Sequence, residues 1–176
     1  MLKNAQVLTL LKQYRQIKAS LDTLALAIAF EEKHSNNIDG IIYSTSLSQN
    51  ANGMPFPPEG STGDKVYNVV HSYPQIAKEE LRDAAYLRLV RDTREHVLNQ
   101  IDTAVSYLQG ADKILVAEGY IGGISTPELI ETYDEVRFLS DSSLKRRKAD
   151  AVKQIAQMLV VSEEQYQMVI LNMSEL

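Results

Sequence analysis

The first evidence for the fold is one stretch near the N-terminus, Val7-Leu-Thr-Leu-Leu-Lys-Gln-Tyr-Arg-Gln-Ile-Lys-Ala-Ser-Leu-Asp-Thr-Leu-Ala-Leu-Ala-Ile28. Its apolar residues alternate at spacings of three and four, which is the heptad pattern of a helix that buries one side. No Gly or Pro interrupts the pattern. We therefore predict one long helix over residues 2–33, whose seam is formed by Val7, Leu10, Tyr14, Ile17, Leu21, Leu24 and Ile28.

A second heptad pattern follows after a break. Residues 34–63 are rich in Ser, Asn, Gly and Pro, so we expect a flexible loop there, with a short extended piece at 41–43. Helix resumes near Gly63, and Pro74 is expected in the first turn of a second long helix, roughly 75–109, which Gly110 ends. The seam of this helix consists of Leu87, Val90, Val97, Ile101, Ala104 and Leu108, with Arg94 at its one polar position.

These two helices predict an all-α fold for the larger part of the chain. The loop between them is long enough for the second helix to return along the first as an antiparallel hairpin. The alternative is a coiled coil, formed either within one chain or between two copies as a homodimer. In either case, residues 1–109 form a helical hairpin or coiled-coil region.

The C-terminal third predicts a helix-turn-helix over residues 110–160. A short helix at 111–120 precedes Gly122-Gly123, and the next helix opens with a capping box of Ser125 and Glu128, with Pro127 in its first turn. An irregular stretch at 134–139 leads to a further helix. That helix is capped by Ser140 or Asp141 and runs to about residue 159.

Residues 161–176 lie beyond the predicted helix-turn-helix. They are expected to add an amphipathic C-terminal helix capped by Ser162, packed either on the core or on a partner.

The helix that starts near Ser140 carries the candidate DNA contacts. In a helix-turn-helix, the N-terminal end of the second helix enters the major groove, where small polar side chains and basic side chains approach base edges and phosphates. Leu144 should point into the core. Each residue turns the helix by about 100°, so the four consecutive basic residues cannot all face DNA. We favour Lys145, Arg146 and one of Arg147 or Lys148. The full candidate set is Ser142, Ser143, Lys145, Arg146, Arg147, Lys148 and, upstream, Arg137.

The charge of the chain makes this basic cluster stand out. The 176 residues carry a formal net charge of -5, which argues against non-specific nucleic-acid binding by the chain as a whole. Residues 137–153 nevertheless contain six basic side chains and two acidic ones. A DNA interface is therefore expected only at this segment.

Other function classes find little support in the residues. There is no Cys, so neither disulfides nor thiolate metal sites are expected. His34, His71 and His96 have no metal-ligand spacing, and Gly122-Gly123 lacks the Lys-Ser/Thr of a phosphate loop. No apolar run approaches the roughly 20 residues of a membrane span. We expect a cytoplasmic protein without catalytic residues, metal or cofactor.

Two segments resemble region four of sigma factors. They are Tyr120-Ile-Gly-Gly-Ile-Ser-Thr-Pro-Glu-Leu-Ile-Glu131 and Leu139-Ser-Asp-Ser-Ser-Leu-Lys-Arg-Arg147. Upstream, Gly53-Met-Pro and Gly60-Ser-Thr-Gly-Asp-Lys-Val66 are similar to a segment of small phage and prophage proteins of Gram-positive bacteria. RinA- and ArpU-type late-operon activators share this layout, and the resemblance covers roughly residues 5–160.

The resemblance implies a phage-type transcriptional regulator in the cytoplasm of a bacterial or phage-infected cell. Its partner would be double-stranded promoter DNA, with RNA polymerase as a candidate second partner. Two features depart from the family: the gap between Glu131 and Ser140 is longer than the usual turn, and residues 160–176 extend past the usual end.

Two alternatives remain open. One is a helical adaptor protein whose basic helix binds an acidic protein rather than DNA. The other is a DNA-packaging component similar to a terminase small subunit, since those proteins also combine a helix-turn-helix with coiled-coil oligomerisation.

Overall fold

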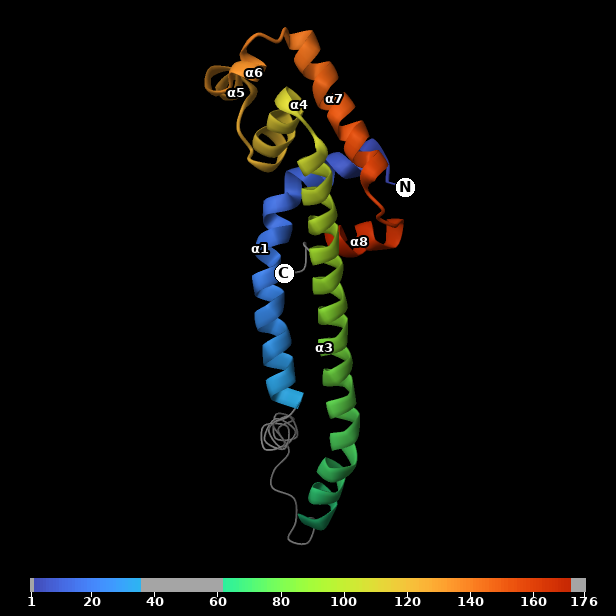
Figure 1. Ribbon diagram of the computed structural model, residues 1–176. Helices are drawn as coiled ribbons and strands as arrows, with labels where there is room; N and C mark the ends of the chain where they lie inside the picture. Colours follow the sequence, from blue (N-terminus) through green and yellow to red (C-terminus); the bar gives the residue numbers. More distant parts are fainter. Residues whose placement is uncertain (1, 36–61, 172–176) are drawn as a thin grey trace. The chain divides into compact units, whose positions relative to one another are not determined.

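The computed structural model describes residues 2–35 and 62–171, with side chains placed in 2–33 and 82–170. All secondary structure in these ranges is helical and none is strand, which confirms the predicted all-α class (Figure 1). The elements are α1 (Asn4–Ser35), α3 (Thr62–Tyr107), α4 (Gly110–Ile114), the π-helix η1 (Leu115–Ile121), α5 (Thr126–Thr132), α6 (Asp134–Arg137), α7 (Asp141–Met158) and α8 (Glu163–Leu171).

The long helices differ from the predicted ranges mainly at the start of α3. This helix begins at Thr62, so the prediction that Pro74 opens a new helix is wrong. A proline inside a helix removes one backbone hydrogen bond, and α3, with 46 residues, retains the bonds of its other turns. The predicted loop therefore ends earlier than residue 63. Its residues 36–61, including the extended piece expected at 41–43, lie outside the described residues.

The chain divides into two compact units. The first comprises Met1–Asp22 and Val90–Leu176, and the second comprises Thr23–Leu89. The domain boundaries expected after residues 109 and 160 stay predictions. The candidate interface belongs wholly to the first unit.

The first unit contains a large core that α1 and α3 share with α7 and α8. In this unit α1 and α3 lie side by side, and their apolar seams face each other (Figure 1). We call this cluster the large core; its buried members are Leu2, Val7, Leu10, Leu11, Tyr14, Ile17, Val97, Leu98, Ile101, Ala104, Val105, Leu108, Val116, Ala151, Val152, Ile155, Ala156, Leu159, Val161 and Val169.

Two polar side chains are also built into the seam of the first unit. The hydroxyl of Tyr14 donates a hydrogen bond to Asp102 Oδ1 at 2.7 Å. Burial, together with this bond, raises the pKa of Tyr14 to about 12. Arg94 is fully buried, and its Nη1 donates to Ser20 Oγ at 2.8 Å. Burial lowers the pKa of Arg94, as expected for a charge removed from water.

The second unit continues the same two helices. Leu24 and Ile28 of α1 are buried, as predicted for their seam, and Ala84 of α3 is buried as well. Arg88 Nη2 forms an ion pair with Glu32 Oε1 on the other helix of this unit, and both side chains are partly exposed. Exposed pairs of this kind contribute little to stability. The burial of apolar side chains is therefore the main contribution to the stability of this unit as well.

The predicted C-terminal helix is present as α8. Ser162 caps it: its Oγ accepts a hydrogen bond from Gln165 N at 3.1 Å, and Gln165 Oε1 accepts one from Ser162 N at 2.9 Å. Val169 of α8 belongs to the large core, so this helix packs on the core of its own chain. Residues 172–176 lie outside the described part of the chain.

A second, smaller core sits beside α4, η1, α5, α6 and the first half of α7. We call it the small core; its buried members are Ala111, Leu115, Leu129, Val136 and Leu144. Leu144 is buried here, as predicted. The small core positions the start of α7, where the candidate DNA contacts lie.

Candidate nucleic-acid interface

The start of α7 is fixed by a serine cap. Ser140 is extended, with φ -68° and ψ 156°, and its Oγ accepts a hydrogen bond from Ser143 N at 3.3 Å. The same Oγ lies 3.1 Å from Ser142 Oγ and donates to Ser143 Oγ at 3.0 Å. Ser140 is therefore the cap, as one of the two predicted alternatives. The hydroxyls of the two candidate residues Ser142 and Ser143 face this cap.

The four consecutive basic residues divide into two pairs. Arg147 Nη1 binds Asp112 Oδ1 of α4 at 3.0 Å. Lys148 Nζ donates to Thr126 Oγ1 of α5 at 2.7 Å and lies 5.9 Å from the centre of the Tyr120 ring. These two side chains fasten α7 to its neighbours. Lys145 and Arg146 are exposed and have no ion pair or hydrogen bond within the described ranges.

Arg146 stands at the middle of the solvent face of α7. The buried residues Leu144, Ala151 and Ile155 define the opposite side of the helix. Seven residues are close to two full turns, so Lys153 lies on the same face as Arg146, and it is exposed too. This face, which we call the basic face, consists of Arg146 and Lys153 at its centre and Lys145 at its edge, with the exposed Asp150 beside them. The heptad spacing of Arg146 and Lys153 is a signal that the sequence already carried.

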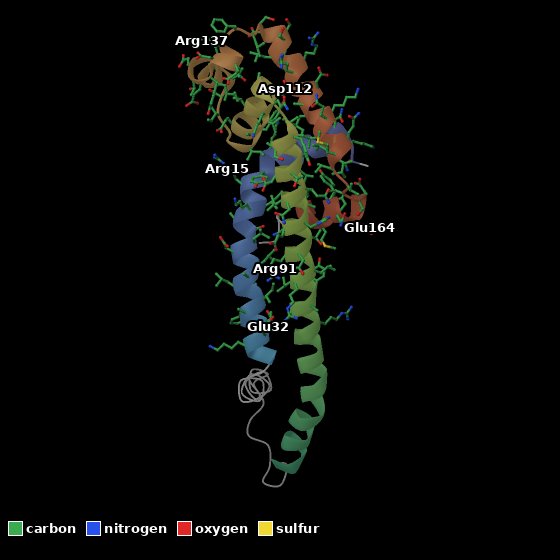
Figure 2. All side chains as sticks on the ribbon, viewed as in Figure 1. Arg15, Glu32, Arg91, Asp112, Arg137 and Glu164 are labelled. Carbon is green, nitrogen blue, oxygen red and sulfur yellow. The ribbon has the colours of Figure 1, made fainter. Side chains whose placement is uncertain are left out.

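Arg137 lies on a different element from the basic face. It ends α6, and its side chain is exposed (Figure 2). Arg137 Nη1 lies 3.6 Å from Asp134 Oδ1 one turn earlier, and both side chains are largely exposed. Such a pair is weak and is readily exchanged for another anion. Arg137 is therefore close in sequence to the start of α7 but belongs to α6.

The elements before α7 differ from a short helix-turn-helix connection. Eight residues, 133–140, separate α5 from α7, and the stretch predicted to be irregular contains the helical turn α6. The usual connection is a turn of three or four residues. Instead, α5 packs with α6 and η1, while α7 packs with α4 and η1. Ser125 occupies the cap position of α5, but the side-chain bond of the predicted capping box is not formed.

The surface of α5 and α6 is acidic. Glu128, Glu131, Asp134 and Glu135 are exposed there, against the single cation Arg137. A helix that crosses the DNA backbone needs cations rather than carboxylates. Among α5, α6 and α7, the exposed positive charge is therefore confined to α7 and the end of α6. The predicted first helix, which should cross the DNA backbone, supplies little of it.

Gly122 is required by the turn between η1 and α5. The short helix predicted at 111–120 is α-helical only to Ile114 and continues as the π-helix η1. Gly122 N donates to Ala117 O at 2.8 Å, five residues back, which is the bond of a π-turn. A Cβ on Gly122 would collide with the backbone of Glu118. Any larger residue would therefore force the backbone of this turn to shift.

A groove of about 350 Å³ runs beside the basic face. It lies between the first turns of α1, the end of η1 and α7, and Asn4, Leu8, Tyr120, Lys145 and Val152 are among its lining residues. Burial raises the pKa of the Tyr120 hydroxyl, because the charged form is disfavoured away from water. The groove is mostly apolar, with Lys145 beside it as an exposed cation.

No group of three or more His, Asp or Glu in the described ranges is placed to hold a metal ion. Likewise, no helix among residues 2–35 and 62–171 combines the length and apolar character that a bilayer crossing requires. No protein-family model, curated protein or solved structure matches the chain.

One exposed side chain near α7 was missed by sequence reasoning. Phe138, between α6 and Ser140, is 86% exposed, more than any other large apolar side chain in the described part. The spacing of apolar residues in the sequence does not show that Phe138 is exposed while Leu139 packs against the small core. An aromatic residue between two basic positions, Arg137 and Lys145, was the available signal.

Proposed function

We propose that this protein is a phage-type transcriptional regulator that binds double-stranded DNA through α7. The supporting observation is that the side chains of Lys145–Lys148 divide into a bound pair and an unpaired one. Arg147 and Lys148 hold the helix in place, while Lys145 and Arg146 project from it without partners in the described structure. A helix that its neighbours hold in place, with unpaired cations at its N-terminal end, has the properties needed for major-groove and phosphate contacts.

The proposal assigns each candidate residue a distinct role. Lys145 and Arg146 contact phosphates and guanine edges, and Lys153 adds a phosphate contact on the same face. Ser142 approaches a base edge, whereas Ser143 serves mainly the cap, because its N–H and hydroxyl both bind Ser140. Arg137 contacts a neighbouring phosphate. RNA polymerase is the proposed second partner, and the cytoplasm of a bacterial or phage-infected cell is the proposed location.

The net charge of -5 determines the salt dependence that we expect for this binding. Most of the surface repels a polyanion, so the affinity must come from a few local contacts and should fall steeply with salt. A helical adaptor that binds an acidic protein would use the same basic face. The acidic α5–α6 surface beside α7 disfavours contact with the DNA backbone on that side, so the adaptor is kept as a second candidate.

The test compares two double variants with the same change in charge. Lys145→Ala with Arg146→Ala removes two cations of the basic face. Lys12→Ala with Arg15→Ala removes two exposed cations from α1 and serves as the control. Fluorescence anisotropy with a pool of random-sequence duplexes and a salt titration measures binding. Circular dichroism verifies that helicity is retained in both variants.

The α7 variant should bind at least about tenfold more weakly, and its salt slope should fall by about two, one for each lost phosphate contact. The α1 control should remain close to the original protein. Equal losses in both variants would show that only total charge matters. No binding by the unaltered chain to any duplex would favour the adaptor. A ring-sized mass in light scattering would favour the packaging component.

A further inference from the structure

Phe138 is an apolar side chain that the fold turns outward rather than leaves loose. The turn that carries it is held on both sides: Leu139 N donates to Val136 O at 3.1 Å, and Leu144 N donates to Ser140 O at 2.9 Å. Val136 and Leu144 are both buried in the small core. The backbone of Phe138, with φ -92° and ψ 6°, lies in the bridge region that the second central residue of a type I turn adopts. Its position is thus set by the packing of its neighbours.

The surroundings of Phe138 indicate what it meets. Arg137 precedes it and is exposed, and the cap of α7 follows two residues later. Lys145 and Arg146 lie on the first turns of that helix. An apolar protein groove would gain little from neighbouring cations, whereas a DNA duplex offers phosphates for them and an apolar group beside the bases. Between residues 134 and 148 five basic side chains stand against three acidic ones, Asp134, Glu135 and Asp141, so the local charge favours DNA as the occupant.

The apolar group that a duplex presents in its major groove is the 5-methyl of thymine, and Phe is one of the side chains that contact it. We propose that Phe138 recognises thymine in this way, at the edge of the base pairs contacted by the first turn of α7. This inference rests on the proposed DNA-binding function and names a specificity that the basic face cannot supply. Cations contact phosphates and guanine, so an apolar side chain beside them adds a contact to the thymine methyl.

The experiment uses deoxyuridine, which lacks only the 5-methyl group of thymine. Duplexes that the full chain retains from a random-sequence library are sequenced, and each thymine of the preferred site is replaced in turn by deoxyuridine. Binding is measured for the unaltered chain, Phe138→Ala and Tyr107→Ala. Tyr107 is an exposed aromatic residue at the end of α3 and provides the matched control. Both side chains are largely exposed, so neither change should disturb the cores.

For the unaltered chain and Tyr107→Ala, deoxyuridine at one or two positions should weaken binding about fourfold, the worth of one buried methyl group. For Phe138→Ala, thymine and deoxyuridine should bind equally at those positions, with the lower affinity. An undiminished thymine effect in Phe138→Ala would overturn the proposal while leaving DNA binding intact. If no sequence is retained by the unaltered chain, the proposed function itself fails. An unchanged site preference with loss of RNA polymerase association would assign Phe138 to protein contact instead.

Discussion

The two halves of α7 are buried in two different cores. The second half places Ala151, Val152, Ile155 and Ala156 in the large core of twenty buried residues, together with α1, α3 and α8. The first half places only Leu144 in the small core of five buried residues. One continuous helix therefore has a heavily packed end and a lightly packed end, and the lightly packed end carries Lys145 and Arg146.

This difference suggests how the candidate interface combines position with adaptability. Segments with few buried contacts open at lower cost than the whole fold. The large core fixes the axis of α7, while the start of α7 depends on the small core, the Ser140 cap and the bonds from Arg147 and Lys148. We therefore expect substitutions in the two cores to differ in how much they lower the free energy of unfolding and in how far their effect on hydrogen exchange extends along the chain.

The largest expected effect is that of Ile155→Ala. Ile155 is fully buried in the large core, so the cavity should lower the free energy of unfolding by about 3 kcal/mol. Hydrogen exchange should then accelerate throughout the described helices. Leu129→Ala makes a comparable cavity in the small core, and its effect should be confined to α4–α6 and the start of α7. The comparison breaks if Leu129→Ala also accelerates exchange along α1 and α3 to the same extent.

The next effect should be a gain in stability at Arg94. This side chain is fully buried, and its Nε and Nη2 atoms have no hydrogen-bond partner in the described part of the chain. A guanidinium remains charged in proteins, so the burial of this one is uncompensated. Arg94→Met should raise the free energy of unfolding by about 2 kcal/mol. The difference in stability between the large core and the small core should then increase.

The control for that substitution is Arg91→Met one turn earlier. Arg91 is partly exposed and pairs with Asp92 at 2.8 Å, so the change should stay within about 0.5 kcal/mol (Figure 2). Denaturant unfolding measures both variants. A loss of stability in Arg94→Met would mean that the Ser20 bond outweighs the unpaired charge.

The heptad seams of α1 and α3 predicted much of the fold because periodic burial depends on side-chain type alone. Val7, Leu10, Tyr14 and Ile17 are buried as expected. Boundaries depend on competition between neighbouring signals, so the proline rule misplaced the start of α3 at 75 instead of Thr62. Arg94 was recognised as the polar seam position, but its lack of a carboxylate partner depends on which residues of α1 face it.

The candidate site was predictable in its position and less so in its contacts. Serine caps are local, so Ser140 and Ser162 were found from the sequence. The division of Lys145–Lys148 into free and bound pairs depends on Asp112 and Thr126, more than twenty residues away in sequence. No local pattern links those positions. The outward turn of Phe138 likewise follows from the packing of Val136 and Leu144 on either side of it.

The smallest expected effect sharpens the contrast between the ends of α7. Ser140→Ala removes the cap of the lightly packed end and should cost about 1 kcal/mol. Because that end rests on the small core, exchange should accelerate at Ser142–Leu144 and not around Ile155. Ser162→Ala removes an equivalent cap from α8, which packs on the large core, and provides the control. If the candidate interface depends on an ordered start of α7, only Ser140→Ala should weaken DNA retention. Equal losses of retention in both variants would show that the start of α7 has no special role.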